Sequence, residues 1–137
     1  MRHQVRKNRF GYGQDANEML LRKLAKNFLK TGYLKTTITK AKVLKSHLEN
    51  LVSKMVVFSQ ANKNYLLKYL GDEKIVEDGF KVIGQSFKEI KGGYVKIIKT
   101  GLRKGDGSLV AEVRWAHPLI TTKEEKPQKE KEETKKS

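Results

Sequence analysis

The stretch 91–115 constrains the fold of this chain most, because two runs rich in β-branched residues flank a glycine-containing loop there. Such runs suit the pleated, half-buried surface of a sheet, so residues 94–100 and 109–115 are expected to form a hairpin. Glycines that can provide the positive φ angles of the reversal stand at positions 101, 105 and 107. An isolated two-stranded hairpin is only marginally stable in water, so other segments must pack on it.

The two expected strands differ in how clearly their faces separate. In the second strand, alternation predicts one core-facing side made of Leu109, Ala111, Val113 and Trp115. Glu112 and Arg114 fall on the opposite side, which would meet solvent or a partner. In the first strand apolar residues stand on both sides, so either side could point inward.

The first part of the chain predicts a helix followed by a third strand. We expect the helix to begin after Asp15 as its N-cap, with Glu18 completing a capping box, and to end at Gly32. The run 33–38 is short and β-prone, and it is the candidate third strand beside the hairpin.

The main core helix is expected next. It would open at Lys40 after a cap at Thr39, and its apolar residues recur at three- and four-residue spacing as far as Val56. After a break, residues 65–70 predict a short helix that ends at Gly71. A further helix would begin at Asp72, and the glycines within it at positions 79 and 84 indicate a kink or a split.

These elements predict a mixed α/β (α+β) fold, with three or four helices packed on a small three-stranded sheet. Residues 1–14 would form a basic N-terminal arm, 15–118 a single α/β domain, and 119–137 a disordered polar tail. A chain of 137 residues is long enough for one ordinary core.

The charge is strongly basic and unevenly distributed. Thirty Lys and Arg residues oppose fifteen Asp and Glu residues, which gives a net charge of +15. Residues 1–45 carry twelve basic and two acidic side chains, so most of the excess lies in the first third. Such a balance points to a polyanion, usually nucleic acid and less often an anionic membrane surface. Without cysteines, a membrane-length apolar run or a secretory signal, the chain is expected to be soluble and intracellular.

The candidate contacts with a polyanion come from the arm, both long helices and the hairpin. The aromatics Phe10 and Tyr12 of the arm could stack on unpaired bases. A like-charged column on the first helix repels itself, and cations at the start of the second helix oppose its dipole, so both patterns favour binding of a polyanion. The candidate residues are Arg2, His3, Arg6, Lys7, Arg9, Arg22, Lys23, Lys26, Lys30, Lys35, Thr36, Lys40, Lys42, Lys45, Lys96, Lys99, Arg103 and Lys104.

The sequence offers little for catalysis. The three histidines, at 3, 47 and 117, are far apart and have no carboxylate at ligand spacing, so no metal site is expected. The glycine-rich loop 101–108 lacks the pattern of a nucleotide-binding loop, and no nucleophile motif is present. We expect no enzymatic activity, no cofactor and no small-molecule substrate.

Five short motifs occur in a specific order. They are Met1-Arg2-His3, Lys35-Thr36-Thr37 with Lys40-Ala41-Lys42, Glu49, Gly92-Gly93-Tyr94, and Arg103 with Gly105-Asp106. In order and spacing, the chain from Met1 to about Trp115 resembles the bacterial large-subunit ribosomal protein L17 family. The chain departs from the family pattern at Asp15-Ala16, where a His-Arg pair is usual, and at Asn50, where a proline is usual.

The resemblance implies an α/β domain without enzymatic activity, held by 23S-type ribosomal RNA beside neighbouring large-subunit proteins near the nascent-chain exit. The expected function is therefore that of a cytoplasmic structural protein that clamps distant RNA segments by neutralising their phosphates, with specificity from RNA shape. The alternative is a DNA-binding nucleoid or regulatory protein, which would share the charge pattern. An RNA-modifying enzyme is a further alternative, and it would require a cofactor pocket.

Overall fold

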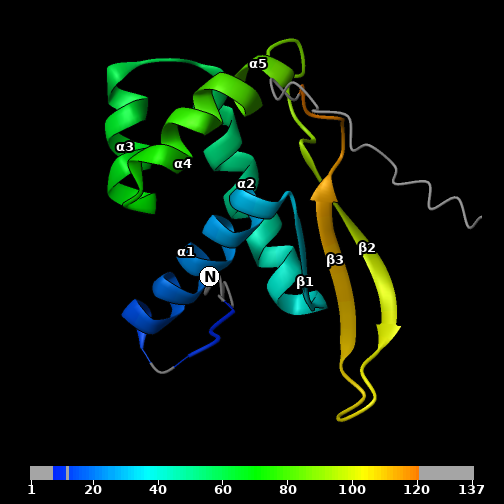
Figure 1. Ribbon diagram of the computed structural model, residues 1–137. Helices are drawn as coiled ribbons and strands as arrows, with labels where there is room; N and C mark the ends of the chain where they lie inside the picture. The colour runs from blue at the N-terminus through cyan, green and yellow to red at the C-terminus, as the bar shows by residue number, and fades with distance from the viewer. Residues whose placement is uncertain (1–7, 12, 121–137) are drawn as a thin grey trace, which may run out of the picture.

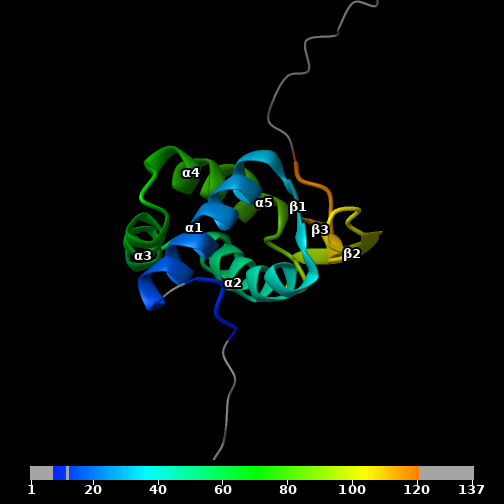
Figure 2. The same cartoon turned by 90° about the horizontal axis from the view of Figure 1, so that it is seen from below.

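The computed structural model describes residues 8–11 and 13–120, and in this part of the chain helices cover one side of a small sheet. All the helices in Figure 1 and Figure 2 lie on the same side of the sheet, and α2 is nearest to it. The predicted class, helices packed on a three-stranded sheet, is confirmed. The elements in chain order are α1 (Gln14–Thr31), β1 (Tyr33–Thr37), α2 (Ile38–Val56), α3 (Gln60–Leu70), α4 (Glu73–Asp78), the π-helical turn η1 (Gly79–Ile83), α5 (Gly84–Ser86), β2 (Val95–Leu102) and β3 (Leu109–Trp115).

The sheet has the strand order β1-β3-β2, and all its pairs are antiparallel. Val113 lies at its centre, opposite Leu34 of β1 and Ile97 of β2. The predicted hairpin, the third strand and the inward side of β3 are therefore confirmed. Val95 is buried and Ile97 packs against the core, which shows that this side of β2 points inward.

The loop glycines only partly follow the prediction. Gly101 and Gly107 have φ angles of 123° and 68°, but Gly105 has no positive φ, so the expectation for Gly105 is wrong. The Asp106 side chain accepts a hydrogen bond from the Ser108 N–H at 3.1 Å and closes the turn around Gly107. One left-handed residue is then sufficient in the turn, whereas Gly101 lies at a bulge within β2.

The predicted helix caps are wrong at both long helices. α1 begins after Gly13, and the Gln14 side chain donates a hydrogen bond to Glu18, the residue expected to complete a capping box around Asp15. α2 begins at Ile38, directly after β1, with Thr37 at the N-cap position. Ile38 packs against the core, so burial of this residue fixes the junction in place of a side-chain cap at Thr39. The predicted stop at Gly32 is confirmed, with φ of 73° and an N–H bonded to the Phe28 carbonyl at 2.7 Å.

α2 supplies the main core surface, as its spacing predicts. Its fully buried residues contact the sheet on one side and the remaining helices on the other; they include Ala41, Leu44, Leu48 and Val52. The rings of Phe28 and Phe87 are also fully buried, with centroids 4.7 and 5.4 Å from that of Trp115. None of the helices in residues 13–120 is long and apolar enough to cross a membrane.

The region after α2 differs from the prediction in detail. α3 begins at Gln60 rather than at residue 65. In its first turn the Asn62 side chain donates a hydrogen bond at 2.8 Å to the carbonyl of Val57, which precedes the helix. The helix that follows Asp72 does not split, because η1 joins α4 to α5, but its α-helical form is interrupted over Gly79–Ile83, from the first of the two glycines that indicated a kink or a split up to the second. A Cβ at Gly79 would lie 2.8 Å from Met55 Sδ, so this glycine allows the helix to approach α2 closely.

The ends of the described chain contact the body. The Phe10 N–H donates to Asn17 Oδ1 at 3.2 Å. At the other end Leu119 packs against the core, and the Ile120 N–H donates to Ser86 Oγ at 2.8 Å. Residues 1–7 and 12 of the expected arm lie outside the described residues, and so does the tail beyond residue 120.

Candidate nucleic-acid interface

A groove lies where β1, the start of α2 and the hairpin meet, and we call it the basic groove. Its lining residues are Lys35, Thr36, Thr37, Lys40, Thr100, Gly101, Leu102, Arg103 and Val110. The lining contains three cations and three threonines and no carboxylate. Cations and hydroxyl groups can both donate hydrogen bonds to the oxygen atoms of a phosphate backbone.

Local structure explains why these residues converge. β1 runs into α2 without a loop, so Lys35 and Lys40 stand on either side of one junction. Val110 of β3 pairs with Thr37 on one side and with Gly101 on the other, which brings the hairpin beside that junction. In Figure 1 the hairpin extends past the start of α2. The Thr100 hydroxyl donates to the Val110 carbonyl at 3.1 Å and fixes the strand next to the bulge.

The start of α2 adds to the positive potential of the basic groove. Thr37 makes no side-chain capping bond, and the first turn of the helix contains no acidic residue. The N-terminal end of a helix carries a partial positive charge and unpaired N–H groups, both of which favour anions. Lys40 is therefore in a locally unfavourable position until an anion is bound.

Arg103 has a structural contact as well as a place in the groove. Its Nε donates to Asp106 Oδ1 at 2.9 Å, and its Nη2 forms an ion pair with Oδ2 of the same residue. The Ser108 hydroxyl donates to Asp106 at 2.8 Å. The hydrogen bond from Arg103, followed by those from Ser108, holds the pKa of Asp106 well below its usual range. Lys104 lies exposed beside this pair.

The basic column on α1 divides into two kinds of residue. The Arg22 guanidinium lies 5.7 Å from the centre of the Tyr69 ring, and Lys30 Nζ lies 3.7 Å from Asp72 Oδ2. Lys23 is exposed and Lys26 is half-buried, and neither forms an ion pair with a described carboxylate. Half of this column therefore contacts the protein itself, a role that the sequence argument did not include.

The remaining candidates lie outside the basic groove. Lys42 is exposed and Lys45 is half-buried on α2, while Lys99 is exposed on β2. Arg9 lines a hollow between the start of α1 and His47 of α2. Arg2, His3, Arg6 and Lys7 lie outside the described residues.

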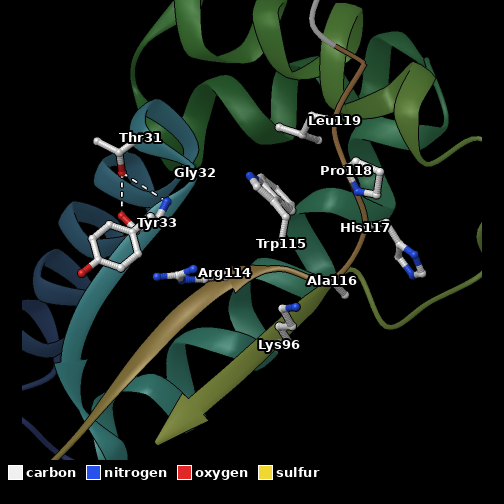
Figure 3. Close-up of a pocket in the computed structure, with 10 residues that line it drawn as sticks. All are labelled: Thr31, Gly32, Tyr33, Lys96, Arg114, Trp115, Ala116, His117, Pro118 and Leu119. Carbon is white, nitrogen blue, oxygen red and sulfur yellow. Dashed lines mark hydrogen bonds between the residues drawn. The ribbon is translucent and has the colours of Figure 1, made fainter. Parts of the chain in front are cut away.

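A further hollow lies at the opposite end of the sheet, and beside the candidate Lys96 it contains residues that the sequence argument missed. Figure 3 shows Tyr33, Lys96, Arg114 and His117 around Trp115. The Arg114 guanidinium lies 5.2 Å from the centre of the Tyr33 ring and forms a 2.9 Å ion pair with Glu112. Alternation along β3 had placed Arg114 away from the core, and its pairing with Lys96 across the strands could have marked it as a candidate.

The comparisons with known proteins agree on one family. The model of the ribosomal protein L17 family matches residues 20–116. The large ribosomal subunit protein bL17 of Coprothermobacter proteolyticus is 37% identical over 116 residues, which cover 85% of this chain and 99% of that protein. The bL17 protein of Rickettsia canadensis is 30% identical over 135 residues, 98% of this chain and 99% of the relative. The chain therefore belongs to the ribosomal protein L17 family.

Proposed function

We propose that this chain binds large-subunit, 23S-type ribosomal RNA by holding its phosphate backbone in the basic groove. A member of the ribosomal protein L17 family is a structural constituent of the ribosome and not an enzyme. The relatives are named as proteins of the large ribosomal subunit, which in bacteria lies in the cytoplasm. The proposal concerns how the chain is held there.

One observation carries the proposal: Lys35 of β1, Lys40 of α2 and Arg103 of the hairpin loop line one groove whose lining contains no carboxylate. Hydroxyl groups of the neighbouring threonines can donate to phosphate oxygens between these cations. Because the groove is built on a helix and a sheet, it would hold RNA against a rigid body. Recognition of this kind reads the position of the backbone and the shape of the RNA rather than its base edges.

The other basic candidates would extend the contact beyond the groove. They are Arg2, His3, Arg6, Lys7 and Arg9 of the arm, Arg22, Lys23, Lys26 and Lys30 of α1, Lys42 and Lys45 of α2, and Lys96, Lys99 and Lys104 of the hairpin. Among the described candidates only Lys30 and Arg103 form an ion pair with a described carboxylate. The other candidates within residues 8–11 and 13–120 are not neutralised by such a pair, which supports a role in binding a polyanion.

The proposal also includes the surroundings of the chain in the subunit. The resemblance to the bacterial family implies neighbouring large-subunit proteins near the nascent-chain exit. Protein crosslinks from this chain in purified large subunits would test this position. Crosslinks exclusively to proteins distant from the exit would contradict it.

The salt dependence of RNA affinity tests the proposed contact. Several phosphate contacts predict a loss of roughly a hundredfold or more in affinity for protein-free large-subunit RNA between 50 and 200 mM salt. The changes Lys35→Ala and Lys40→Ala should each reduce the slope of log affinity against log salt by about 1. Lys74 is an exposed residue of α4 that does not line the basic groove, so Lys74→Ala is the matched control and should leave the slope unchanged. A salt-independent affinity, or equal competition by duplex DNA, would contradict the proposal.

A further inference from the structure

A second groove, largely apolar, lies at the far end of α2, and we call it the aromatic groove. It is lined by Met55, Val56, Phe58, Lys63, Glu77, Phe80, Lys81, Gly84, Gln85 and Lys88. Along α2, Met55 of this groove lies fifteen residues (55 − 40) after Lys40 of the basic groove, which is roughly 22 Å at the usual helical rise. RNA held at the start of α2 would therefore leave this surface accessible.

The aromatic groove contains apolar side chains that are exposed in the part of the chain that the structure describes. Phe58 is 72% exposed, and Val57 beside it is 60% exposed. The Phe58 ring meets that of Phe80 edge to face, with the centroids 5.1 Å apart. The pair makes one fixed aromatic wall beside the thioether and aliphatic groups of Met55 and Val56. Large apolar groups that gather at one concave surface are typical of interaction sites.

The charges around this groove indicate what kind of partner fits. Lys63, Lys81 and Lys88 line it together with a single carboxylate, that of Glu77. None of the three lysines forms an ion pair with a described carboxylate. A partner that inserts an apolar side chain and carries carboxylates beside it would satisfy both the apolar wall and the three cations.

We propose that the aromatic groove docks a protein segment in which an aliphatic or aromatic side chain is flanked by acidic residues. The surface favours protein over RNA for two reasons. Aliphatic and thioether groups gain most from burying an apolar side chain, whereas nucleic-acid bases require a planar face on which to stack. In addition, the edge of one ring already meets the face of the other, so that face is not available to a base. The inference goes beyond RNA binding, and it takes only the setting, the large subunit, from the proposed function.

Photo-crosslinking in assembled large subunits tests this inference directly. A diazirine amino acid is placed at position 58 in one full-length variant and at position 102 in another, because Phe58 and Leu102 are equally exposed, at 72%. Position 102 lines the basic groove and should give RNA adducts. Position 58 should give a protein adduct, mapped to a segment with an apolar residue next to Asp or Glu. RNA adducts from position 58, or no adduct, would overturn the inference. A failure of position 102 alone would count against the proposed RNA contact and not against this inference.

Charge reversal tests the acidic character of the partner. Lys81→Glu should lower the yield of the protein adduct from position 58 severalfold, because it places a carboxylate against the acidic segment. Lys74→Glu is the matched control, since Lys74 is also exposed but does not line the groove, and it should leave the yield unchanged. An adduct whose yield is the same in both variants would overturn the assignment of an acidic partner.

Discussion

Glu49 Oε1 accepts a hydrogen bond from the backbone N–H of Val95 at 2.9 Å, which ties the middle of α2 to the first residue of β2. Its other oxygen accepts from the Tyr94 N–H at 3.1 Å. One carboxylate therefore satisfies two consecutive backbone donors where the chain enters the sheet. Glu49 and Tyr94, which belong to two separate motifs of the sequence, are therefore the two sides of one contact.

Removing this carboxylate should destabilise the whole domain. Glu49→Ala leaves two backbone donors without their partner, and hydrogen bonds to a charged group contribute about 1.5–3 kcal/mol. We expect a loss of about this size in the free energy of unfolding, measured by urea denaturation. Asn50→Ala, at an exposed neighbouring position, is the control and should change stability by less than about 0.5 kcal/mol. An equal effect of the two changes would show that the two hydrogen bonds accepted by Glu49 contribute nothing to the stability of the domain.

The close approach of the η1 region to α2 gives a second prediction. A Cβ at Gly84 would lie 2.5 Å from the Met55 carbonyl oxygen, although its φ of −59° is ordinary helical geometry. Gly84→Ala should therefore destabilise by about 1–3 kcal/mol through overpacking, against a helix-propensity gain of at most about 1 kcal/mol. Gly92→Ala is the control, because a Cβ there would have no neighbour within 4 Å. Thermal unfolding of both variants measures these changes in stability. A stabilising effect of Gly84→Ala would contradict the close approach of this region to α2.

Much of the fold could be predicted from the sequence, because the alternation around Val113 and the helical spacing around Leu48 are local patterns that survive in the structure. The role of Gly84 could not, since helix propensity records only the cost of a glycine and not its contact with Met55. The basic groove was predictable in its residue types but not in its assembly. Arg103 lines the same groove as Lys35 because of the strand register and the bulge at Gly101, and both depend on tertiary pairing.

The Asp106 carboxyl predicts a pH dependence confined to the hairpin loop. Its pKa in the folded chain is lowered, so the folded state binds the proton less readily than the unfolded state. Its contribution to loop stability is therefore present above the unfolded pKa of about 3.9 and is lost progressively as the pH falls from there through the lower pKa of the folded chain. The Gly107 N–H donates to the Arg103 carbonyl at 2.9 Å, and its protection factor against exchange, which is corrected for the pH dependence of intrinsic amide exchange, should fall as this happens. Asp106→Asn should abolish this change, and a loop equally protected at pH 7 and pH 2 would contradict the prediction.

Two helix-ending glycines provide the last prediction, because they share a backbone conformation but differ in their neighbours. Gly32 and Gly71 have φ angles of 73° and 64°, so alanine at either position should cost about 1–2 kcal/mol in left-handed strain. A Cβ at Gly71 would meet nothing within 4 Å, whereas one at Gly32 would lie 3.2 Å from Nε1 of Trp115. Gly32→Ala should therefore lower the midpoint of urea unfolding more than Gly71→Ala does. It should also change the fluorescence of Trp115, the only tryptophan in the chain, in the folded state. Equal costs with unchanged fluorescence would mean that the Trp115 ring moves aside freely, and the close packing of Gly32 on this ring would then contribute nothing to stability.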